Sequence, residues 1–212
     1  SLVTAFDPDC RLCPRLARHL AQVRRDHPGY HARPVAPFGD RRARLLVVGL
    51  APGMHGANRT GRPFTGDHAG ILLYRTLHKF GFANRPEAVA RADGLKLKRC
   101  RITNAVKCLP PDNKPTPAEA RTCRVYLESE LKALSAGAVI LALGGVAHQS
   151  VLRALALKPS AYPFGHGVCY RLPNGLQLLT SYHCSRYNTQ TRRLTPAMFE
   201  AVVRDAKRLL KK

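Results

Sequence analysis

Three short apolar runs constrain the fold of this chain more than any other feature. They are "RLLVVGL" (44–50), "RITNAVK" (101–107) and "AVILAL" (138–143). Short runs of aliphatic and β-branched residues are typical of strands buried on both faces of a sheet. Segments with helical spacing stand between them, so the chain is predicted to be an α/β sandwich around a largely parallel sheet.

Capping and turn residues mark several other elements. Segments 14–26 and 69–82 have helical spacing, and the residues "TPAE" (116–119) predict a helix start with a capping box. The dipeptide "TP" at 195–196 opens a last helix. The sequence "PNG" between 168–172 and 176–182 predicts a β-hairpin.

Polar loops follow the predicted strands at three places. They are loop 51–68, loop 107–116 and the segment from His183 to Arg193. The carboxyl ends of parallel strands lie on one edge of the sheet, where open α/β folds form their binding crevice. We therefore expect one composite site built from three distant segments.

The charge balance favours a polyanionic partner. The chain has 35 Lys and Arg against 13 Asp and Glu, a formal net charge of +22. Nucleic acid, an anionic membrane surface and a ribosome would all suit such a field, and nucleic acid is favoured. The basic residues are spread along the chain, which indicates a charged folded face. No run is long enough to cross a bilayer, so no membrane association is expected.

The loop "GLAPGMHGANRTGRPFTGDHAG" (49–70) does not match a nucleotide-binding motif. Arg62 and Pro63 stand where a phosphate loop needs Lys and Ser or Thr. We interpret its glycines as letting the backbone approach a flat ligand. Taken singly, Phe64 is typical of a core residue, Asn104 of a backbone cap and His183 of a satisfied structural histidine. Their expected convergence on one edge favours a functional interpretation.

The seven cysteines include a Cys-x-x-Cys pair, Cys10 and Cys13, and two later residues, Cys108 and Cys123. A disulfide framework is not expected in a chain of this size without a secretion signal. Four thiolates could bind Zn²⁺ or an iron–sulfur cluster, and generic spacing rules favour zinc. Four unrelated buried cysteines are the structural alternative.

The segments "GLAPGMHGANRTGRPFTGD", "NAVKCLPPDNKP" and "HCSRYNTQTRRLT" together resemble the uracil-DNA glycosylase superfamily, and in particular its type-B branch, family five. The resemblance runs from the Cys-x-x-Cys pair to the last helix. It implies one domain over residues 1–212, a three-layer sandwich with a central, mostly parallel four-stranded sheet. It also implies a structural [4Fe–4S] cluster, in preference to zinc, on Cys10, Cys13, Cys108 and Cys123.

The resemblance implies hydrolysis of the N-glycosidic bond of uracil, and of other deaminated bases, in DNA. Phe64 would stack on the extruded base, Asn104 would bond its polar edge and His183 would donate to a carbonyl oxygen. The implied substrate-binding residues are Gly53, Phe64, Asn104, Ser185, Arg186 and Asn188. No suitably placed lysine nucleophile is evident, so a monofunctional enzyme is expected, acting as a monomer in the cytoplasm.

The water-positioning residue is less obvious. Better-known branches carry an acid or amide near Ala51, and this chain, like the type-B branch, has none there. Asp67 is the candidate to position water or to stabilise the cationic sugar, and Asn113 is a second candidate. A helix cap is an equally weighted alternative for Asp67. The chain also departs from its relatives at Cys184, where Pro is frequent, and at Arg192, where Gly is frequent.

Two other functions compete with this interpretation. The first is a non-enzymatic nucleic-acid-binding module with a structural zinc site. The second is a hydrolase of nucleotides or phosphate esters, which would need a metal in the crevice. Asp67 is the only carboxylate of the glycine-rich loop, so the second alternative has little support.

Overall fold

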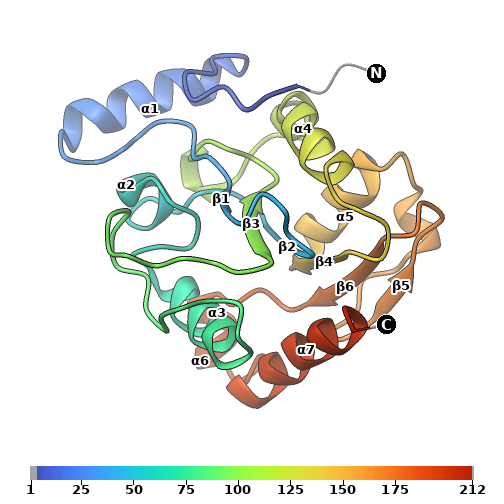
Figure 1. Cartoon of the computed structure of the whole chain (residues 1–212). Helices are drawn as coiled ribbons and strands as arrows, with labels where there is room; N and C mark the ends of the chain where they lie inside the picture. Colours follow the sequence, from blue (N-terminus) through green and yellow to red (C-terminus); the bar gives the residue numbers. More distant parts are fainter. Residues whose placement is uncertain (1–3, 212) are drawn as a thin grey trace.

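The computed structural model describes residues 4–211 and is built on one mixed sheet with the strand order β1-β3-β2-β4-β6-β5 (Figure 1). The four inner strands are parallel, and β1 and β5 pair antiparallel with β3 and β6 at the two edges. The strands are β1 (Phe38–Gly39), β2 (Leu45–Gly49), β3 (Cys100–Asn104), β4 (Val139–Leu143), β5 (Cys169–Arg171) and β6 (Gln177–Ser181).

The expected sheet is right in its parallel centre and wrong in its strand count, because it has six strands and not four. The two additional strands are short edge strands. β1 has two residues, and β5 has three residues whose first and last are exposed. Neither is long enough to show the alternation of apolar residues that identifies a strand in a sequence. The hairpin predicted at "PNG" is confirmed as the antiparallel pair of β5 and β6.

Helices cover both faces of the sheet, which confirms the three-layer arrangement (Figure 1). Leucines and aromatic residues of α3 and α7 pack on one face, and α4 and α5 pack on the other. Helix α1 lies outside these layers, beside the cysteine-bearing N-terminal segment (Figure 1). The α-helices are α1 (Pro14–Asp26), α2 (Ala57–Thr60), α3 (His68–Lys79), α4 (Pro117–Lys132), α5 (Gly145–Ala154), α6 (Arg186–Gln190) and α7 (Pro196–Leu209), with short 3-10 turns η1 (Pro111–Asn113) and η2 (Pro159–Ala161).

The predicted capping box at the start of α4 is confirmed. The Oγ1 of Thr116 accepts the backbone N–H of Glu119 at 3.1 Å, and the Glu119 carboxylate accepts the N–H of Thr116 at 2.8 Å. Two otherwise unpaired donors of the first turn are thereby satisfied. Helix α1 also has the bounds expected from the sequence.

The carboxyl ends of the inner strands lie at one edge, as expected. Gly49 at the end of β2 is paired with Asn104 at the end of β3, and Leu143 of β4 is paired with Ser181 of β6. The three polar loops therefore leave the sheet from the same side. Within residues 4–211, no helix is both long enough and apolar enough to cross a membrane.

Candidate active site

A cavity of about 300 Å³ opens at this edge of the sheet. All three polar loops contribute to it. Seven of the predicted catalytic and substrate-binding residues line it: Gly53, Phe64, Asp67, Asn104, Asn113, His183 and Ser185. Apolar side chains and backbone complete the wall at Leu50, Ala51, Pro52, Ala57 and Ala69. Arg186 and Asn188 do not line the cavity.

Phe64 forms the aromatic part of the wall. Its ring centroid lies 5.9 Å from that of His183, with the ring planes inclined by 35°. Its backbone is left-handed, at φ +53°, a strained conformation for a bulky side chain. The neighbouring contacts hold it there. The hydroxyl of Tyr74 donates to the carbonyl of Pro63 at 2.6 Å, and a Cβ at Gly70 would lie 1.8 Å from the Phe64 carbonyl oxygen.

Two glycines make room for the side chains of the cavity. A Cβ at Gly49 would lie 2.5 Å from Oδ1 of Asn104 and 2.6 Å from Cζ of Phe64. A Cβ at Gly56 would lie 2.0 Å from Oδ2 of Asp67. These distances are below any real contact, so a side chain at either position would force the facing side chains of the cavity to move. From the sequence, the glycines were expected to face a flat ligand. That these two glycines leave space for side chains of the cavity wall was not predicted.

Asn104 presents an unused polar group to the cavity. The residue is 4% exposed, and its side-chain oxygen is buried without a hydrogen-bond partner in the part of the chain that is described. Buried amides are nearly always paired, so an unpaired one is available to a ligand. Its backbone carbonyl accepts Nζ of Lys107 at 2.7 Å.

Lys107 was not singled out from the sequence. Its ammonium is buried and also contacts Thr103 and Glu130, the latter at 2.9 Å. The lysine thus fixes the end of β3, where Asn104 stands. A lysine inside the apolar segment "NAVKC" is the one sequence signal that pointed to it.

His183 carries a neutral imidazole near pH 7, because burial lowers its pKa below the ordinary value of 6.5. A neutral imidazole still donates one N–H. Asn188 supports this residue from outside the cavity, since its Nδ2 donates to the His183 carbonyl at 3.0 Å. Ser185 caps α6 by accepting the Asn188 N–H at 3.1 Å, and Arg186 is exposed at the first position of that helix.

Asp67 occupies the N-cap position of α3 without making a capping hydrogen bond. Its Oδ1 is buried and unpartnered within residues 4–211. Burial raises the pKa of its carboxyl group. The nearby N–H of Gly70 and the charges of His68 and Arg59 oppose this rise, although no hydrogen bond of good geometry forms. Asp67 therefore stands at the N-cap position, but its carboxylate accepts no hydrogen bond from the first turn of α3.

The rim of the cavity joins the first and last motifs. Nε2 of His68, in α3, lies 2.8 Å from Oγ1 of Thr189, in α6. Cys184 and Arg192, which the sequence analysis singled out, belong to the segment that follows β6. Cys184 is fully buried in the core, and Arg192 has a left-handed φ of +62°, a conformation that favours glycine.

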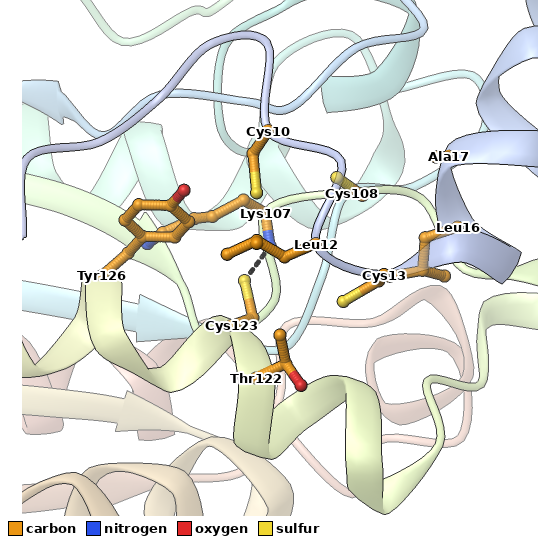
Figure 2. A pocket seen from close by; sticks show the side chains of 10 residues that line it. All are labelled: Cys10, Leu12, Cys13, Leu16, Ala17, Lys107, Cys108, Thr122, Cys123 and Tyr126. Atoms are coloured by element: carbon orange, nitrogen blue, oxygen red, sulfur yellow. Dashed lines mark hydrogen bonds between the residues drawn. The ribbon is translucent and has the colours of Figure 1, made fainter.

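The four cysteines singled out from the sequence line a second cavity (Figure 2). Cys10 and Cys13 come from the segment before α1, Cys108 follows β3, and Cys123 lies on α4. Burial is the main cause that raises the pKa of Cys13 to about 11 and of Cys108 to about 12. The charges of the other thiolates raise both pKa values further, so a cationic centre would relieve a real repulsion.

The chemistry of this donor set suits a metal centre, because four thiolates can bind either Zn²⁺ or an iron–sulfur cluster. In the described ranges, no group of three or more His, Cys, Asp or Glu side chains is already arranged to hold a metal ion. The four thiols surround one cavity whose other walls are mostly apolar. The backbone N–H of Lys107 donates to Sγ of Cys123 at 3.3 Å (Figure 2), a bond that favours the thiolate form.

The α/β sandwich carries an edge cavity lined by a phenyl ring, an amide, an imidazole and a carboxylate. Such a lining is chemically suited to a small planar polar ligand. Residues 36–207 match the family model described as "Uracil DNA glycosylase superfamily". The chain belongs to this superfamily, and within it to the type-5 branch.

Relatives cover nearly the whole chain. It is 51% identical to the type-5 uracil-DNA glycosylase of Thermus thermophilus, over 94% of this chain and 93% of the relative. It is 48% identical to that of Mycobacterium tuberculosis, over 94% and 78% of the two chains. The crystal structure of wild-type SMUG2 from Pedobacter heparinus shares the fold, with a TM-score of 0.52, 13% identity and coverage of 98% and 93%.

Proposed function

We propose that this chain removes uracil from DNA by hydrolysing the N-glycosidic bond, leaving an abasic site. One observation carries the proposal. A single cavity brings Phe64, Asn104 and His183 together from three distant segments, in a chain of this superfamily. The roles below follow from the chemistry of those side chains.

The target nucleotide is extruded from the duplex so that its base enters the cavity. The base stacks on the ring of Phe64. The side-chain amide of Asn104 carries both a donor and an acceptor, and so complements the N3–H and the adjacent carbonyl of uracil. Its oxygen is already buried and unpaired, so the free protein leaves this bonding capacity open.

The bond that breaks joins N1 of uracil to C1′ of the deoxyribose, and its electron pair leaves with the base. His183 donates its N–H to the carbonyl oxygen on which the negative charge grows. A preorganised donor of this kind contributes about 3 kcal/mol to a transition state. The sugar becomes oxocarbenium-like, and water then adds its oxygen to C1′ and releases a proton.

Asp67 is proposed to orient that water or to stabilise the positive sugar. Its carboxylate lines the cavity and has a free oxygen. Asn113, on the opposite loop, is proposed as a second group that holds the water. Arg186, exposed at the start of α6, is assigned to DNA phosphates rather than to the base.

The reaction is proposed to be monofunctional. Among the described residues that line the cavity, none is a lysine. The ammonium of Lys107 is held by Thr103, Asn104 and Glu130, and is therefore not free to attack C1′. Borohydride should trap no covalent adduct between the protein and uracil-containing DNA.

We further propose that Cys10, Cys13, Cys108 and Cys123 hold a [4Fe–4S] cluster. When bound, the cluster would fasten the N-terminal segment to the loop after β3 and to α4. Its role is structural, because the thiols line a cavity other than that of the base. Arg15 and Glu119 add a second tie between α1 and α4, at 2.6 Å.

The enzyme is proposed to act as a monomer, in the cytoplasm, on DNA that contains uracil. Other deaminated bases are proposed as further substrates. Hypoxanthine, for example, carries the same pairing of a ring N–H and an adjacent carbonyl that the Asn104 amide complements.

Two measurements test the proposal. The first incubates duplexes bearing one uracil with the protein and follows base release and alkaline scission, with a thymine duplex as control. We expect release from the uracil duplex only, in the presence of excess chelator. The second measures iron and acid-labile sulfide, and about four irons per chain are expected. Stoichiometric zinc, or no base release by folded protein, would contradict the respective proposal.

A further inference from the structure

A second cavity, of about 310 Å³, lies between α4 and α5 at the same edge of the sheet. It borders the uracil cavity, because Leu50 lines both. Three arginines line it: Arg121 and Arg124 from α4, and Arg153 from α5. No carboxylate is among its lining residues.

The three arginines lack the carboxylate partners that Arg15 and Arg62 have. Arg15 is paired with Glu119, and Arg62 with Asp93, each at less than 3 Å. Arg121, Arg124 and Arg153 make no hydrogen bond or ion pair in the described part of the chain, and Nε of Arg124 is buried without a partner.

The three charges also repel one another. Burial and the charges of Arg153 and Arg121 lower the pKa of Arg124. Glu128, further along α4, offsets part of this effect but forms no ion pair with Arg124. Arg121 and Arg153 are exposed and Arg124 is half-buried, so an anion can reach all three, and the unpaired Nε of Arg124 is a donor that such an anion would satisfy.

We propose that this arginine cavity binds a backbone phosphate of the DNA strand that carries the extruded uracil. The proposal rests on the proposed function, because it takes uracil-containing DNA as the partner. Arginine forks suit phosphate oxygens, which accept two parallel N–H bonds. Since Leu50 lines both cavities, the phosphate is expected close to the uracil along the same strand.

The test compares Arg124→Gln, Arg153→Gln and the double variant with Arg171→Gln. Arg171 is an exposed arginine on β5, paired with the first residue of β6. It therefore lies at the opposite end of the strands. Affinity for a uracil duplex is measured over a range of salt concentrations, and base release is measured in single turnover at saturating protein.

For the double variant we expect about tenfold weaker binding and a salt slope reduced by about one. Arg124→Lys, which keeps the charge, should retain most of the affinity. Arg171→Gln should bind as wild type does. The arginine variants should release uracil at the wild-type rate once the protein is saturating, because none of the three arginines lines the uracil cavity.

A neutral methylphosphonate placed at each phosphate near the uracil locates the contact. Wild-type protein should lose affinity at one position, and the double variant should lose nothing further there. Wild-type affinity and salt slope in the double variant would overturn the proposal. The proposal would also be overturned if the double variant lost binding of inorganic phosphate but kept wild-type affinity for DNA. The ligand of the arginine cavity would then be a free anion.

These results are separable from a failure of the proposed function. If wild-type protein released no uracil while the arginine variants still bound DNA more weakly, the phosphate site would stand and the glycosylase proposal would fall.

Discussion

The ring centroids of Phe64 and His183 lie 5.9 Å apart, with the planes inclined by 35°. Stacked rings need about 3.5 Å for each layer, so a third ring between these two would need about 7 Å. The two side chains therefore form adjacent walls and cannot sandwich a base. In the proposed mechanism, uracil would therefore stack on the free face of Phe64, and His183 would meet it at its edge, where an imidazole N–H can reach a carbonyl oxygen.

The close approach at Gly49 gives a first prediction. In Gly49→Ala, the new methyl group would meet both Asn104 and Phe64, and the two side chains would have to move. We expect base release to fall at least about tenfold, because small misplacements at reacting groups are costly. Gly29→Ala is the matched control, since its Cβ would have nothing within 4 Å. Unchanged base release in Gly49→Ala would show that these side chains need not be fixed.

Asp67→Asn separates the two interpretations of that residue. Asn caps a helix about as well as Asp, so a capping role predicts little change in activity. We expect base release to fall while DNA affinity is retained, because the charge is lost. The melting temperature should rise, since burial penalises the carboxylate. Wild-type activity in the folded variant would remove Asp67 from the mechanism.

The pH dependence of base release follows from the raised pKa of Asp67. The pKa of Asp67 is raised above its ordinary value of 3.8. Activity that needs the carboxylate is present above that raised pKa and is lost as the pH falls through it. The acidic limb of the wild-type profile should therefore lie above pH 3.8 and should be absent in Asp67→Asn. The same limb in both proteins would assign it to another group.

His183 makes a separate contribution to stability. Because the folded-state pKa is lowered from 6.5, the unfolded chain takes up this proton first on acidification. The contribution of His183 to the free energy of unfolding is thus complete above about pH 6.5 and decreases below it. In denaturant titrations, the free energy of unfolding should fall less between pH 7 and pH 5 in His183→Gln than in the wild-type protein. An identical loss in both proteins would contradict a buried, neutral imidazole.

Lys107 is predicted to position Asn104. Lys107→Met removes the contacts to Thr103 and to the Asn104 carbonyl and leaves Glu130 without its partner. We expect a loss of about 3 kcal/mol in the free energy of unfolding, with slower base release at saturating DNA. Glu130→Gln is the milder control, because the ammonium keeps its other two acceptors. Slow release in a variant of unchanged stability would point to a direct catalytic role instead.

The sequence was sufficient to predict which loops form the site, because the topology of a parallel sheet places the loops that follow its strands at one edge. Strands ending at Gly49, Asn104 and Ser181 bring their loops to one edge whatever the loops contain. The capping box at Thr116 could also be predicted from the sequence, because it depends on two residues only three positions apart.

Other features depend on contacts that no local pattern encodes. The edge strand β1 forms by pairing Phe38 and Gly39 with β3, and two residues are too few to show a strand pattern in the sequence. Asn188 was expected at the base and instead holds the His183 carbonyl, because both positions lie in one short polar loop. The pairing of Lys107 with Glu130 joins β3 to α4 across the sheet face, and neither residue identifies the other in the sequence.

The most direct test of the account is the single-turnover rate of uracil release by His183→Ala, measured against wild-type protein on the same duplex. We predict a decrease of about 100-fold or more, as for loss of an oxyanion-stabilising donor, with DNA affinity retained and with a cooperative thermal transition that shows the variant to be folded. Release at the wild-type rate would contradict the claim that uracil leaves from the cavity shared by Phe64, Asn104 and His183.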